Sequence, residues 1–89
     1  MVNAQYRDLH HELNSLKKAV TESEEVAEPQ KLEIAVDIES LKDQLAKPSP
    51  SKTIVGHLWS AIEKAVTAAG FIEYVAKIQP LIGSLLPPS

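Results

Sequence analysis

Three histidines are the residues of this sequence best suited to metal binding, because neutral imidazole is the commonest metal ligand in proteins. Two of them are adjacent, in His10-His11-Glu12, and the third is His57. Neighbouring side chains on a helix point about 100° apart, so the adjacent pair is poorly placed to hold one ion. The His-Glu-x-x-His spacing of zinc hydrolases is absent, since Asn14 and Ser15 stand where its second histidine would be. We therefore expect no metal site and interpret this stretch as a solvated helix face.

Nucleophilic catalysis also lacks its sequence context. Serine, histidine and aspartate all occur, but there is no Gly-x-Ser-x-Gly turn to expose a serine nucleophile. The three glycines, Gly56, Gly70 and Gly83, lie too far apart to form a phosphate-binding loop. The chain has no cysteine, which excludes disulfides, thiolate nucleophiles and cysteine-based zinc sites. We expect a protein that is not an enzyme, with no cofactor and no small-molecule substrate.

Charge is unevenly distributed along the chain. Residues 1–47 hold ten acidic and six basic side chains, which leaves −4, and residues 48–89 hold two acidic and three basic ones, which leaves +1; the net charge is −3. Binding to a phosphate backbone depends on neutralising many phosphates at once, and this sequence has no basic stripe. We expect no nucleic acid among its partners. The lack of cysteine and of a secretory signal in the first residues favours a cytoplasmic location.

The spacing of apolar residues predicts two amphipathic helices in the first half of the chain. Over 4–25, apolar residues recur at intervals of three and four: Tyr6, Leu9, Leu13, Leu16 and Val20. Over 29–47 the same spacing gives Ile34, Ile38, Leu41 and Leu45, with charged residues on most of the remaining surface. Pro29 suits the first turn of the second helix, where its missing N–H has no helical partner. Together the two segments predict an αα-hairpin.

The second half of the chain is more apolar. The block Pro48-Ser49-Pro50-Ser51 ends the second helix, because each proline disfavours a helical conformation in the residue before it. A broad apolar band then runs from 51 to 86 at mixed three and four spacing. Gly70 marks either a kink in one helix or the joint between two, and Pro80 predicts a bend near 76–79. We expect one all-α domain, a three- or four-helix bundle built from the hairpin and this C-terminal region.

One longer pattern resembles a known class of module. It reads Leu32-x-Ile34-x-x-x-Ile38-x-x-Leu41-x-x-x-Leu45-x-Lys47-Pro48-x-Pro50, followed by a helix with Gly56 and an alanine-rich run into Gly70. This layout resembles helical tail modules at the ends of bacterial effector, sensor and defence-associated proteins, and it covers residues 28–86. The resemblance implies a module that tethers or assembles and does not catalyse. It implies no individual functional residues.

The apolar surface after residue 51 exceeds what two amphipathic helices of moderate width can cover. We therefore predict a non-catalytic interaction or oligomerisation module that uses residues 54–86 to bind a protein partner or a second copy of itself. Tryptophan is enriched among binding hot spots. The residues expected at the interface are Leu58, Trp59, Ile62, Phe71, Val75 and Ile78. The alternative for Trp59 and Phe71 is a place in the core of the domain itself.

Two other functions fit the sequence. In the first, the apolar C-terminal region associates with a membrane, and the hairpin from 4 to 47 shields it until a trigger releases it. Glu73, Lys77 and Pro80 disfavour a transmembrane span there. In the second, the chain is a small inhibitor or antitoxin that neutralises a basic enzyme through four acids near the first inter-helix turn: Glu22, Glu24, Glu25 and Glu28. Liposome flotation separates the membrane hypothesis from the others.

Overall fold

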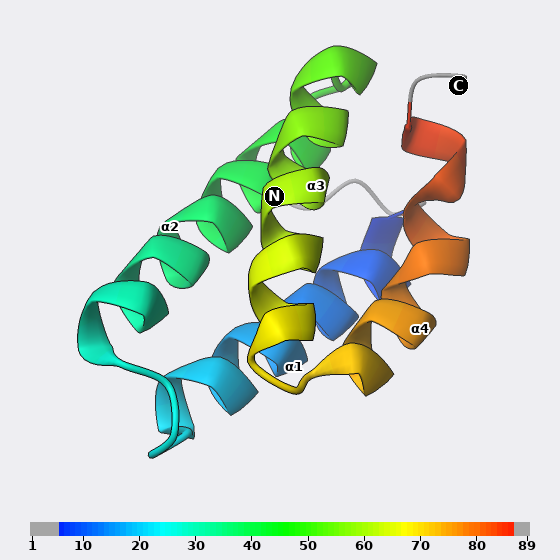
Figure 1. The fold of residues 1–89 in the computed structure, drawn as a ribbon. Coiled ribbons are helices and arrows are strands. Elements are labelled where there is room, and N and C mark those ends of the chain that lie inside the picture. Colours follow the sequence, from blue (N-terminus) through cyan, green and yellow to red (C-terminus); the bar gives the residue numbers. More distant parts are fainter. Residues whose placement is uncertain (1–5, 87–89) are drawn as a thin grey trace.

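Four α-helices and one short 3-10 turn follow one another along the chain (Figure 1). The computed structural model describes residues 6–86. Its elements are α1 (Arg7–Glu22), α2 (Glu28–Leu45), α3 (Lys52–Ala68), α4 (Ile72–Ile82) and η2 (Gly83–Leu85). No strand occurs within the described range. The prediction of an all-α bundle is confirmed, and the bundle has four helices over these residues.

The hairpin α1–α2 forms because each helix buries one apolar stripe. α1 buries Leu9, Leu13, Leu16 and Val20, and α2 buries Ile34, Ile38, Leu41 and Leu45, which are the stripes that the spacing predicted. Residues 4 and 5 of the expected first helix lie outside the described range. The connection between the helices is anchored by Val26, which is buried although the apolar period is lost around it.

α2 ends at Leu45, two residues before the expected end at 47, and the Pro/Ser linker then leads to the start of α3. Ser51 is the N-cap of α3, and its hydroxyl oxygen accepts a hydrogen bond from the backbone N–H of Ile54 at 3.3 Å. The backbone N–H of Ser51 in turn donates to the side-chain oxygen of Gln44 on α2, also at 3.3 Å. The end of one helix is therefore tied to the beginning of the next.

At Gly70 the chain leaves one helix and starts another. Gly70 has a φ of +95°, a conformation that side chains with a Cβ rarely adopt. The N–H of Phe71 donates to the carbonyl of Val66 at 2.8 Å, and the N–H of Gly70 donates to Thr67 at 3.1 Å. This pair of bonds is the Schellman motif that closes a helix C-terminus. Of the two alternatives for Gly70, the structure shows the joint.

Pro80 lies inside the last helix and does not end it. α4 continues through Pro80 to Ile82 before η2 begins. A proline inside a helix removes the N–H that would bond to the carbonyl four residues earlier, here that of Ala76. Both residues are exposed, so water can reach this part of the backbone and satisfy the carbonyl.

Each helix packs against two others, in the order α1 with α2, α2 with α3, α3 with α4 and α4 with α1. Figure 1 shows α2 and α3 side by side, with α1 passing beneath them toward α4. All buried residues in the described range are apolar and form one continuous core. None of the described helices contains a stretch long and apolar enough to span a bilayer.

This core absorbs most of the apolar band of the second half. Its members from that half are Val55, Trp59, Ile62, Val66, Ile78, Ile82 and Leu85. The large hydrophobic side chains left exposed there are Ile54, Ile72 and Leu81. The structure leaves less apolar surface uncovered than expected, because α2 packs against α3 and α1 packs against α4.

Candidate functional site

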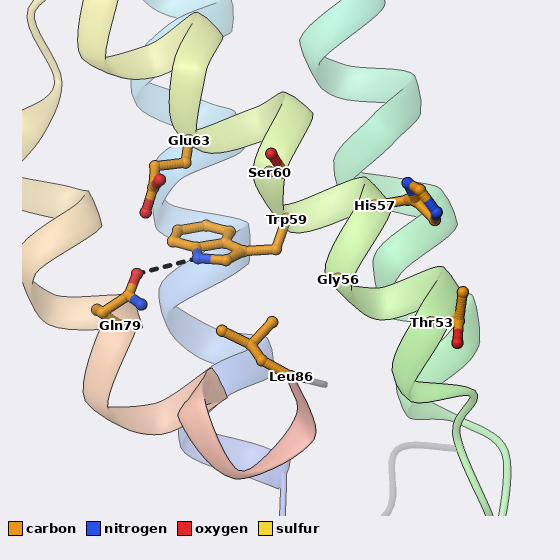
Figure 2. A pocket seen from close by; sticks show the side chains of 8 residues that line it. All are labelled: Thr53, Gly56, His57, Trp59, Ser60, Glu63, Gln79 and Leu86. Atoms are coloured by element: carbon orange, nitrogen blue, oxygen red, sulfur yellow. Dashed lines mark hydrogen bonds between the residues drawn. The ribbon is translucent and has the colours of Figure 1, made fainter. Parts of the chain in front are cut away.

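A groove of about 410 Å³ lies between α3 and the segment formed by α4 and the residue after η2 (Figure 2). Six of its lining residues come from α3: Thr53, Gly56, His57, Trp59, Ser60 and Glu63. Gln79 of α4 and Leu86 complete it. The residues of α3 recur mostly at three- and four-residue intervals and spread over about half of the helix circumference. The groove is thus a consequence of how α3 packs beside α4.

The indole of Trp59 occupies the base of the groove. Trp59 is 3% exposed, and its Nε1–H donates a hydrogen bond to the side-chain oxygen of Gln79 at 3.0 Å. A buried indole N–H needs such a partner, since leaving it unpaired costs about 1–3 kcal/mol. The bond joins α3 to α4 across the groove. It also leaves the NH₂ group of Gln79 available as a donor.

Polar groups surround this apolar base. Figure 2 shows Glu63 and Gln79 on the side of α3 to which the indole extends, whereas His57 and Thr53 extend from the other side. Glu63 has no ion-pair partner among residues 6–86. Leu86 adds a second apolar surface next to the indole. An apolar hollow with a few polar groups at its edge suits the side chain of a partner.

The six residues predicted at an interface differ in how deeply the structure buries them. Ile62 and Ile78 are fully buried in the core and leave no surface for a partner, whereas Trp59 takes the core place that was its alternative and still lines the groove. Their spacing placed them on an apolar side of a helix, and the rest of the same chain covers that side. Leu58, Phe71 and Val75 are half-buried and pack against the core from its edge. Only Trp59 lines the groove.

Seven of the eight residues that line the groove were not among the interface residues predicted from the sequence. Gly56, Ser60 and Glu63 stand three or four residues from Trp59 or from one another. Their spacing alone would have predicted that they lie near the tryptophan on α3. The contribution of Gln79 had no such signal. It depends on the turn at Gly70, which places α4 beside α3.

The histidines lie apart from this groove, except for His57. His10 on α1 is half-buried, and its Nδ1 lies 3.2 Å from the side-chain nitrogen of Asn14, while His11 is exposed. Within the part of the chain that the structure describes, no three metal-binding side chains come together. The structure thus places the three histidines on two helices without gathering them.

A cluster of three charged side chains joins α1 to α2 near His10. One oxygen of Glu39 accepts from Lys17 at 3.0 Å and from Lys42 at 2.9 Å. Hydrogen bonds from Lys42 and Lys17 lower the pKa of Glu39. Burial, aided by the charge of Lys42, lowers the pKa of His10, and the nearby Glu39 opposes this in part. The bond from Lys17 to Glu39 joins the two helices, and both shifted groups lie outside the groove.

Fold and groove together define a small four-helix protein with a tryptophan-based hollow on one side. Comparison with protein-family models, curated proteins and solved structures finds no match to the chain. The resemblance to helical tail modules therefore stays a prediction.

Proposed function

We propose that this chain is a non-catalytic protein-binding module whose α3–α4 groove receives an apolar side chain of a partner protein. The observation that supports the proposal is the open hollow of about 410 Å³ with Trp59 at its base and Leu86 at its edge. Tryptophan-lined pockets are where binding energy concentrates in protein interfaces. The groove lies within residues 54–86 and their immediate neighbour Thr53, the region that the sequence favours for binding.

The backbone of α3 favours a close approach at this place. Gly56 lines the groove without a Cβ, so a partner side chain can reach the helix backbone there. Ser60 and the NH₂ group of Gln79 offer hydrogen bonds at the edge, and Glu63 offers a carboxylate. Apolar base and polar rim are the usual anatomy of a protein interface.

A display library of random peptides of about 12 residues, selected against the whole protein, tests this proposal. We expect enriched sequences to share one large apolar residue and to shift the backbone amide resonances of Gly56, Trp59 and Gln79. The variant Ser60→Tyr fills the groove from an exposed position and should weaken binding about tenfold or more. It should leave the circular-dichroism spectrum unchanged.

The matched control is Ala61→Tyr. Ala61 is the next residue of α3, is also exposed and does not line the groove, so this variant should bind the selected peptides normally. Equal loss in both variants, or selected peptides whose shifts lie elsewhere, would contradict the proposal. Sedimentation at micromolar concentration separately tests whether the partner is a second copy.

A further inference from the structure

The outer side of α2 carries apolar side chains that the fold leaves exposed. Leu32 is 67% exposed and Val36 is 54% exposed. They lie four residues apart, and the exposed Pro29 stands three residues before Leu32, so the three share one side of the helix. The buried stripe of α2 occupies a different side. We call Pro29, Leu32 and Val36 the outer stripe.

Carboxylates dominate the charge of this helix. α2 has five acidic residues and two lysines, so it carries −3. Both lysines are already paired, Lys31 with Glu28 at 3.3 Å and Lys42 with Glu39 at 2.9 Å. In the described part of the chain, the acids of α2 without an ion pair are Glu33, Asp37 and Asp43. The outer stripe is therefore an apolar strip on a helix with unneutralised negative charge.

We propose that the outer stripe binds an amphipathic helix of another protein whose apolar seam is flanked by lysine or arginine. The three- and four-residue spacing of the stripe matches the seam of a helix laid alongside it. The cations of such a helix neutralise the acids that α2 leaves unpaired. A second copy is a poor occupant because two α2 helices, each at −3, repel each other. An anionic membrane is repelled for the same reason.

This surface is separate from the proposed groove. α2 packs against α1 and α3, and the groove lies on the side of α3 next to α4. The outer stripe could therefore bind its partner while the groove is occupied, and each surface can be altered without touching the other.

The probe is a synthetic peptide of about 18 residues made of leucine and lysine in helical amphipathic order. Titration into the full chain by calorimetry should show saturable binding of one peptide. The double variant Leu32→Gln with Val36→Gln should lose about tenfold or more in affinity, because it removes the apolar contact. Glu33→Gln with Asp43→Asn should lose about fivefold near 50 mM salt and show a weaker salt dependence, because it removes opposite charge.

Two controls separate this proposal from general attraction between opposite charges. Ile72→Gln alters an equally exposed apolar residue on α4 and should bind the peptide normally, as should the groove variant Ser60→Tyr. A leucine–glutamate peptide of the same pattern should not bind. The proposal is overturned if the peptide does not bind, if the outer-stripe variant binds as the wild type does, or if sedimentation shows a dimer that Leu32→Gln dissociates.

Discussion

At the scale of single residues, the fold lowers the pKa of His10 and the pKa of Glu39. The lowered pKa of His10 means that the unfolded chain binds its proton more readily than the folded one. Above the ordinary histidine pKa of 6.5 both states are neutral, and below it protonation favours unfolding until the folded pKa is passed. The lowered pKa of Glu39 has a separate consequence. It stabilises the folded protein above pH 4.5, the ordinary pKa of the carboxyl, and this stabilisation is lost as the pH falls through the pKa of the folded state.

We predict that His10→Gln flattens the fall in stability between pH 7 and the folded pKa of His10. The measurement is the midpoint of urea denaturation at several pH values, with circular dichroism as the signal. His11→Gln is the control, because His11 is adjacent but exposed and should keep the wild-type pH profile. Identical profiles for His10→Gln and the wild type would show that burial of His10 does not couple its protonation to folding.

Glu39 should matter little at neutral pH despite its two cations. Lys17 and Glu39 keep 36% and 46% of their side-chain surface exposed, and water and salt weaken such pairs. We predict that Glu39→Gln costs about 0.5 kcal/mol at pH 7 and that about 0.5 M salt removes most of the difference. Paired denaturation curves at low and high salt measure both quantities. A loss that survives high salt would contradict the exposed-pair description.

Among elements, the two turns that end α3 and α4 place their glycines in opposite conformations. Gly70 has a φ of +95°, whereas Gly83 has a φ of −53°, which any residue adopts. A Cβ meets no atom within 4 Å at either position, so the backbone alone decides the outcome. We predict that Gly70→Ala destabilises the protein by about 1–2 kcal/mol. We predict that Gly83→Ala is neutral or stabilises by up to about 1 kcal/mol. Thermal unfolding of both variants tests the contrast.

The start of α3 depends on a single side chain. Ser51→Ala removes the hydroxyl that accepts from Ile54 and should cost about 1 kcal/mol, whereas Ser51→Asp should keep the cap. Ser49→Ala is the control, since Ser49 is an exposed linker residue that does not cap a helix. Chemical denaturation compares all three. Equal stability of Ser51→Ala and Ser49→Ala would show that the cap is unimportant.

At the scale of the whole molecule, one continuous core predicts one unfolding transition. Ile38 of α2 is fully buried, and Ile38→Ala should cost about 2–5 kcal/mol, depending on how far the neighbours relax. Leu32→Ala, six residues earlier on the exposed side of the same helix, should change stability by less than about 0.5 kcal/mol. Both variants should still unfold in a single step, because every helix contacts two others.

The sequence predicted the helices well and the surface poorly. Helix formation depends on residues close together in the sequence, whereas burial of a surface depends on residues far apart in it. A stripe such as Leu9-Leu13-Leu16-Val20 is a local signal, because helix geometry alone puts its members on one side. Whether a stripe meets another helix of the same chain is not local. Trp59, Ile62 and Ile78 carry the same signal as interface residues would, but the core of the same chain buries them. Gly70 allowed either a kink or a joint, and its φ of +95° shows the joint.

The candidate site shows the same division. The polar residues beside Trp59 on α3 follow from spacing within one helix. The bond from the indole to Gln79 joins residues 20 positions apart and exists only because the chain reverses at Gly70. Val26 is a further case, since one apolar residue in an acidic connection gives no period, yet the fold buries it. The sequence pattern does not determine which residues far apart in the chain come into contact.

The position of Trp59 makes the protein its own optical probe. It is the single tryptophan of the chain, and its indole is buried, hydrogen-bonded to a second helix and part of the groove wall. Indole fluorescence moves to longer wavelength when water reaches the ring, so unfolding should shift the emission to the red. A ligand that enters the groove should change the emission without changing the helical content. One unlabelled sample therefore reports separately on folding and on occupation of the groove.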